Sequence, residues 1–219
     1  MAAYITLAAG MILMPCLYWG AMMWYRASFQ KDENRQRRPL RSAPEIAVMA
    51  LAELALARIW WSLGKCTGTD MTFQMLFVML AAMTFFCMTD YWEQVVPNRV
   101  LLILLLLYVI LLGWQGLRDM EVVLWELPSI ILGLLFCMLS FGFGYLFSRG
   151  SMGAGDVKLA LVMGLYLSGE YVVGAVLYGC IAGAVFSIVQ LVRKKLTRKD
   201  AIPFVPFLYL GLIIRYLVG

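Results

Sequence analysis

Two aspartates, Asp90 and Asp156, stand at the boundaries of long apolar segments. Asp90 ends one segment in CMTDYWEQVVPN, and Asp156 opens another in SRGSMGAGDVKLALVMG. An acidic side chain at a membrane boundary is costly and is therefore a candidate for function. Two carboxylates held a few ångströms apart share a proton, because both cannot ionise comfortably. The ionised one can take a proton from attacking water while the other donates to a peptide carbonyl, which is aspartyl-protease chemistry without metal or cofactor.

Each aspartate also has a structural interpretation. Asp90 could be a solvated residue where a helix leaves the membrane, and Asp156 could be the N-cap of the helix that follows it. Gly153-Ala154-Gly155 could form a tight turn, and neither GxGxxG nor GxxxxGK[ST] is present to indicate a phosphate site. Length favours a site, since a helix over 156–168 rises only about 18–20 Å. If its far end reaches the outer interface, its glycine-rich start lies in the membrane, where irregular backbone needs protein or a water cavity beside it.

The elements that must position these residues are membrane helices. Apolar residues make up 63% of the 219 residues and charged residues 14%, against about 45–50% and about 25% in soluble domains. The sequence therefore predicts an all-α fold, a polytopic membrane helix bundle of about eight transmembrane helices. The expected spans are the apolar runs 4–25, 44–63, 71–89, 99–115, 121–147, 156–168, 171–192 and 202–218.

The basic residues indicate the topology. The net charge is +5, but the basic residues lie in short loops between apolar runs, which argues against a nucleic-acid partner. If all eight runs cross with the N-terminus outside, fourteen basic residues lie in inner loops and only Lys65 and Arg118 lie in outer ones. If 44–63 instead lay along the membrane surface, that bias would nearly vanish. We therefore expect both termini outside and both aspartates at the cytoplasmic face.

We expect two parts, two N-terminal spans with a short basic cytoplasmic loop at 1–70 and a six-span core at 71–219. The first run lacks a basic leader and a clear cleavage site, so we interpret it as a retained span. Histidine is absent and the five cysteines are scattered without a CxxC pair, so no metal site, His-based triad or disulfide framework is expected.

The sequence resembles the type IV prepilin peptidases, the GxGD-type intramembrane aspartyl proteases, over roughly residues 71–218. The resemblance rests on Asp90 with Pro97-Asn98 downstream, on GAGDVKL at 153–159, and on IPFVPF at 202–207. It implies cleavage of a short basic leader, after a glycine, from type IV pilin-like precursors at the cytoplasmic membrane surface. This would place the protein in the bacterial cytoplasmic membrane, in contact with lipid.

Carried over residue by residue, the resemblance makes Asp90 and Asp156 the catalytic pair. Gly153 and Gly155 would shape the turn that holds Asp156, and Lys158 matches a motif lysine that could position substrate, tune Asp156 or simply anchor the topology. Longer members carry a cytoplasmic loop with two CxxC pairs that is associated with N-methylation of the mature pilin. Here the loop at 26–43 is short and cysteine-free, so N-methyltransferase activity is doubtful.

Three alternatives compete with the peptidase. A transporter or channel could use both aspartates as a proton or cation relay, although inverted repeats are not evident. A Ser–Lys hydrolase could use Ser151 and Lys158, and a membrane scaffold would need neither. The peptidase mechanism requires the third and sixth spans to pack together at their cytoplasmic ends, with the two carboxylates at most about 10 Å apart in an open resting state.

Overall fold

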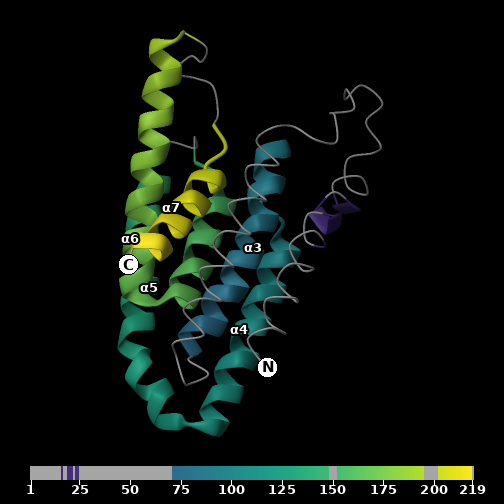
Figure 1. The fold of residues 1–219 in the computed structure, drawn as a ribbon, viewed down its shortest axis with the longest axis vertical. Helices are drawn as coiled ribbons and strands as arrows, with labels where there is room; N and C mark the ends of the chain where they lie inside the picture. Colours follow the sequence, from purple (N-terminus) through teal and green to yellow (C-terminus); the bar gives the residue numbers. More distant parts are fainter. Residues whose placement is uncertain are drawn as a thin grey trace.

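A computed structural model describes residues 16, 19–21, 23–24, 71–147, 152–194 and 202–218. Within these residues every regular element is an α-helix, so the all-α expectation is confirmed. The expected spans at 4–25 and 44–63, and the loop at 26–43, lie wholly or mostly outside the described residues. The helices are α3 (Met71–Glu93), α4 (Asn98–Arg118), α5 (Met120–Phe147), α6 (Ala154–Val192) and α7 (Val205–Val218) (Figure 1).

These helices follow the apolar runs of the sequence. Four of them, α3 to α6, are long and apolar enough to cross a membrane, and α7 is a shorter apolar helix. The protein is therefore a multi-pass membrane protein, while the total of eight spans stays a prediction. Short polar connections separate the helices, as where Asp119 stands alone between α4 and α5. Its backbone N–H still bonds to the Gln115 carbonyl at 2.8 Å, and its side chain accepts from the Val122 N–H at 3.4 Å.

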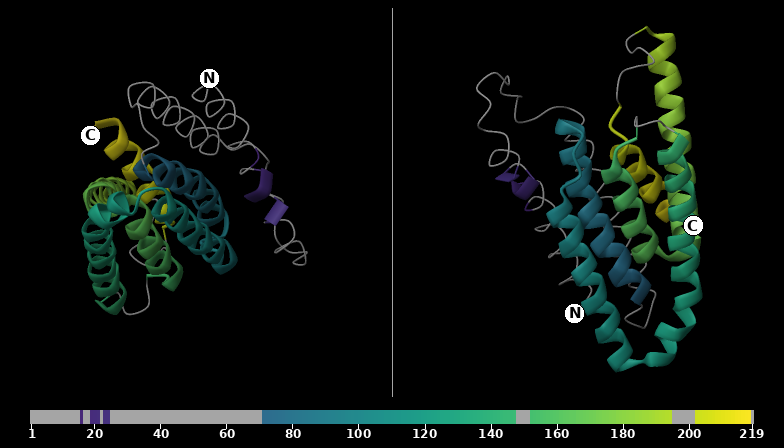
Figure 2. Two further views of the ribbon diagram at one scale, coloured as in Figure 1. Left: turned by 90° about the horizontal axis from the view of Figure 1, so that it is seen from below. Right: turned by 180° about the vertical axis from the view of Figure 1, so that it is seen from behind.

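Helix α6 is two antiparallel segments joined at Ser168. Ser168 has φ 57° and ψ 175°, a conformation that interrupts a helix and is sparsely populated by residues other than glycine. The next backbone N–H, that of Gly169, donates to the Ser129 hydroxyl at 3.2 Å instead of to its own helix. The chain reverses here (Figures 1 and 2), and the break falls where the sequence predicted one span to end at 168 and the next to begin at 171.

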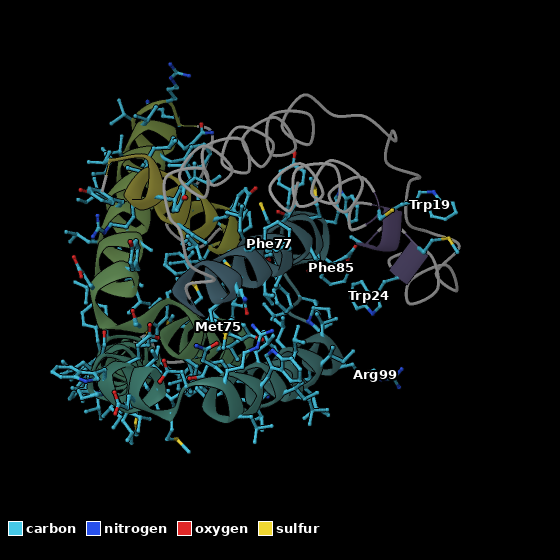
Figure 3. All side chains as sticks on the ribbon, turned by 60° about the horizontal axis from the view of Figure 1, so that its bottom comes forward. Trp19, Trp24, Met75, Phe77, Phe85 and Arg99 are labelled. Carbon is cyan, nitrogen blue, oxygen red and sulfur yellow. The ribbon has the colours of Figure 1, made fainter. Side chains whose placement is uncertain are left out.

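Helix α3 is the most buried of the four helices that are long enough to cross a membrane. In its membrane-spanning window 83% of the residues are buried, against 17% in α4 and 22% in α5. The outer faces of α4 and α5 carry exposed Leu, Ile and Trp side chains, as expected of surfaces that contact lipid. Figure 2 shows α3 beside α4 on one side of the described helices, and Trp24 from the N-terminal region packs edge-on against Phe85 of α3 (Figure 3).

Glycines set the closest helix approaches. A Cβ on Gly133 of α5 would lie 2.7 Å from the Gly164 carbonyl oxygen of α6, and one on Gly164 would lie 2.8 Å from the Gly133 oxygen. On the second segment of α6, a Cβ on Gly179 would lie 2.9 Å from the Phe207 oxygen of α7. Small residues are what allow membrane helices to pack backbone against backbone. These contacts fix α6 between α5 and α7.

Candidate active site

Asp90 is buried at the C-terminal end of α3, with 4% of its surface exposed. Its Oδ2 accepts a hydrogen bond from the Val205 backbone N–H at 2.9 Å, and the Phe204 backbone N–H also donates to this carboxyl group. The interpretation of Asp90 as a solvated residue leaving the membrane is therefore wrong. The carboxylate lies instead against the N-terminus of a different helix, where free N–H groups and the helix dipole stabilise negative charge.

The first turn of α7 explains why a side chain from α3 is needed there. A helix leaves its first four N–H groups without intrahelical partners. In α7, Pro206 has no N–H, and the Phe207 and Leu208 N–H groups donate to the Phe204 carbonyl at 3.0 and 3.3 Å. The remaining donor, Val205, is satisfied by Asp90. The IPFVPF sequence thus presents two backbone donors to one carboxylate.

Asp156 lies in the first turn of α6 and is not its N-cap. The N-cap is Gly153, with φ −69° and ψ 135°, so the N-cap interpretation of Asp156 is wrong by three positions. The Asp156 backbone N–H donates to the Gly153 carbonyl at 3.1 Å, and its carboxylate accepts from the Gly153 N–H. This return bond resembles a capping box, in which the third helical residue satisfies the N-cap N–H.

The two motif glycines are required by close approach. A Cβ on Gly155 would lie 3.0 Å from the Cβ of Val96, in the connection between α3 and α4, and one on Gly153 would lie 3.3 Å from Asp156 Oδ2. Neither has a positive φ, so the chain needs their size here and not their conformational freedom. Ala154 between them is exposed. The G-x-G spacing therefore lets the α3–α4 connection lie directly on the first turn of α6.

Lys158 reaches the same connection from one turn further along α6. Its Nζ donates to Oδ1 of Asn98 at 3.1 Å, across 60 residues of sequence. Asn98 is the first residue of α4 and follows Pro97, the N-cap of that helix, which is buried. The structure therefore brings Pro97, Asn98, Gly155 and Lys158 together, and a contact of the lysine with Asn98 is not among the roles that the sequence suggests for it.

The surroundings of the two aspartates are connected. Helix α3 packs against α6, and Val96 contacts Gly155 within a few residues of each aspartate. Both carboxylates also accept backbone N–H bonds at helix N-termini, Asp90 from α7 and Asp156 from α6. Such an arrangement can hold one ionised and one protonated carboxyl group side by side.

The remaining expectations concern a Ser–Lys hydrolase and a metal site. Ser151, the nucleophile of the Ser–Lys alternative, lies outside the described residues, and its partner Lys158 donates to Asn98. Within 71–147, 152–194 and 202–218, no group of three or more His, Cys, Asp or Glu side chains could hold a metal ion.

Sequence reasoning missed the backbone contribution of α7 and the contact of Val96. IPFVPF at 202–207 enters the sequence analysis only as part of the resemblance. The signal that could have identified the donors is the start of a helix at this motif, because the first N–H groups of a helix have no intrahelical partner and are free to meet a carboxylate from elsewhere.

The family follows from comparison with known proteins. Residues 77–188 match the type IV leader peptidase family, and the chain belongs to this family. It is also 25% identical over 168 residues to a prepilin leader peptidase/N-methyltransferase of Bacillus subtilis (strain 168), an alignment that covers 77% of this chain. The alignment covers 65% of the length of that relative, which is less than two thirds. No solved structure matches the chain.

Proposed function

We propose that this protein is a membrane aspartyl endopeptidase that cleaves the basic leader peptide from type IV pilin-like precursors at the cytoplasmic face of the bacterial membrane. The observation that carries the proposal is the contact of Val96, which follows Asp90 at the end of α3, with Gly155, which precedes Asp156 in the first turn of α6, on two helices that pack together. Membership of the type IV leader peptidase family supports the same conclusion. The name of the Bacillus relative supports a prepilin as the substrate.

In this mechanism the two carboxyl groups divide the proton transfers. The ionised aspartate removes a proton from a water molecule as the water oxygen attacks the peptide carbonyl. The protonated aspartate donates its proton to the carbonyl oxygen. The tetrahedral intermediate then collapses as the first aspartate passes the proton taken from water to the leaving amine, and the second aspartate recovers its proton from the hydroxyl that becomes part of the product carboxyl group. The backbone N–H groups of Phe204 and Val205 hold Asp90 in place throughout, so the reacting geometry is set before substrate binds.

The experiment is cleavage by the purified full-length chain in detergent or liposomes. The substrate is a type IV pilin precursor with its basic leader and first apolar segment, and the product is measured by mass. Cleavage after the glycine at the end of the leader is expected, unaffected by a metal chelator. An Asp156→Asn chain, purified in parallel, controls for contaminating proteases. Equal cleavage by this variant and the wild type would contradict the aspartyl mechanism.

The same assay tests methylation. The loop at 26–43 contains no cysteine, whereas the resemblance associates N-methylation with paired CxxC motifs at that place. We expect the mature product to keep a free N-terminal amine when a methyl donor is supplied. A mass increase of one methyl group would show that this chain methylates without those cysteines.

A further inference from the structure

The connection between α3 and α4, Gln94–Pro97, follows Asp90 in the chain and lies against the first turn of α6, which carries Asp156. At its start, the Gln94 N–H donates to the Asp90 carbonyl at 2.9 Å. In its middle, Val96 lies against Gly155, next to Asp156. At its end, Asn98 accepts a hydrogen bond from Lys158, two residues beyond Asp156. The four residues therefore form a bridge from the end of α3, which carries Asp90, to the start of α6, which carries Asp156.

We propose that Lys158 and Asn98 act as a positioning pair that fixes the separation of Asp90 and Asp156. This inference rests on the proposed function. The pair touches neither carboxylate and acts by holding the bridge against the first turn of α6. The hydrogen bond spans 60 residues and joins α4 to α6 at the start of both helices, where Val96 also packs against Gly155. Further along, the Tyr166 hydroxyl of α6 donates to the Leu104 carbonyl of α4 at 2.6 Å.

Loss of the Lys158–Asn98 hydrogen bond should affect catalysis much more than the stability of the fold. Both side chains of the pair are exposed, and an exposed polar pair contributes little to the stability of the fold. Catalysis is far more sensitive, since a displacement of about 1 Å from a remote change can lower the rate about 100-fold. Loss of the pair should therefore reduce turnover while the protein stays folded.

The positive charge of Lys158 alone cannot account for its contact with Asn98. Arg99 adjoins Asn98 and has the same charge as Lys158, but its side chain extends away from the bundle (Figure 3). A role in attracting an acidic group of the substrate would require only a positive charge at this face. A positioning role requires a donor on α6 and an acceptor at the start of α4.

The test is a double-mutant cycle on cleavage, with Lys158→Met, Asn98→Leu and the double variant. Each single variant should lower kcat about 10–100-fold with KM nearly unchanged, and the double variant should be no worse than the poorer single one. Lys158→Arg, which keeps a donor, should retain most of the activity. Arg99→Met, which removes the same charge without the contact, should match the wild type.

The results that would overturn the proposal are specific. Losses that multiply in the double variant, a change confined to KM, or equal losses in Arg99→Met would each contradict a positioning pair.

A second measurement does not depend on activity. Spin labels at Val95→Cys and Ala154→Cys, both exposed positions, are placed in a chain whose five native cysteines are replaced. The distance distribution should broaden with Lys158→Met or Asn98→Leu and stay unchanged with Arg99→Met.

These two measurements separate the pair from the proposed function. If the wild type cleaves no prepilin but the distance broadens as expected, the proposed function fails and the pair stands as a structural tie between α4 and α6. If the wild type cleaves and the distance does not change in either variant, the positioning pair is wrong and the peptidase stands.

Discussion

Asp90 has two roles that different substitutions separate. Asp90→Asn keeps a side-chain oxygen to accept the Val205 N–H but removes the ionisable group, so cleavage should fall about 10²–10⁴-fold with little change in the melting temperature. Asp90→Leu removes the acceptor as well and leaves buried donors of α7 without a partner, at a cost of about 1–3 kcal/mol for each. Thermal unfolding in detergent together with the cleavage assay checks both expectations. A leucine variant as stable as the asparagine variant would show that Asp90 does not hold α7.

Substitution of Asp156 should remove the same catalytic step as substitution of Asp90, so the two losses of cleavage rate should not multiply. Asp156→Asn should abolish most cleavage, and the double variant with Asp90→Asn should be no slower than the poorer single variant, because the two groups act as a unit. Initial rates of leader removal at saturating precursor give this comparison. Independent, multiplying losses would mean that the two aspartates serve separate steps or separate sites.

At the scale of the helices, the Gly133–Gly164 contact is the clearest test of how α6 is placed. Gly133→Ala would put a Cβ 2.7 Å from a backbone oxygen of α6, and overpacking of this kind costs about 1–3 kcal/mol. Gly142→Ala is the matched control, since it lies on the same helix with no atom within 4 Å of the added carbon. Melting temperatures should fall for the first variant only. A drop of equal size for Gly142→Ala would point to a general intolerance of α5 and not to the contact.

The helices could be predicted from the sequence, but the contacts between them could not. Each crossing helix must be a long apolar run, so the run at 71–89 anticipated α3, and those at 156–168 and 171–192 anticipated the break at Ser168. The bond from Val205 to Asp90 joins residues 115 apart, and no local pattern encodes such a pairing. The resemblance named the aspartates and the lysine, and the structure supplied the partner of each.

At the scale of the whole molecule, the described charges are divided between the two ends of the bundle. Arg99, Lys158 and Arg193 lie toward the end that carries the aspartates, while Arg118 marks the turn between α4 and α5 at the opposite end. Arg215 also lies toward that opposite end, but its side chain is neutralised by Glu170 at 3.5 Å and rests over the ring of Tyr171. Among the described residues, more basic side chains therefore lie at the end that carries the site than at the other, and the positive-inside rule predicts that this end faces the cytoplasm.

This division leads to a topology that reporter fusions can check. Fusions after residues 30 and 196 should be cytoplasmic, and those after 67 and 119 should be external. The fusion after 119 is the sharpest, because α4 begins beside Lys158 and ends at Arg118 after 21 apolar-rich residues, a length of about 30 Å that spans the hydrocarbon core. The site and the α4–α5 turn must then face opposite compartments. A cytoplasmic signal after 119 would turn both aspartates outward, away from the compartment in which pilin-like precursors are made, and the proposed cleavage could not occur there.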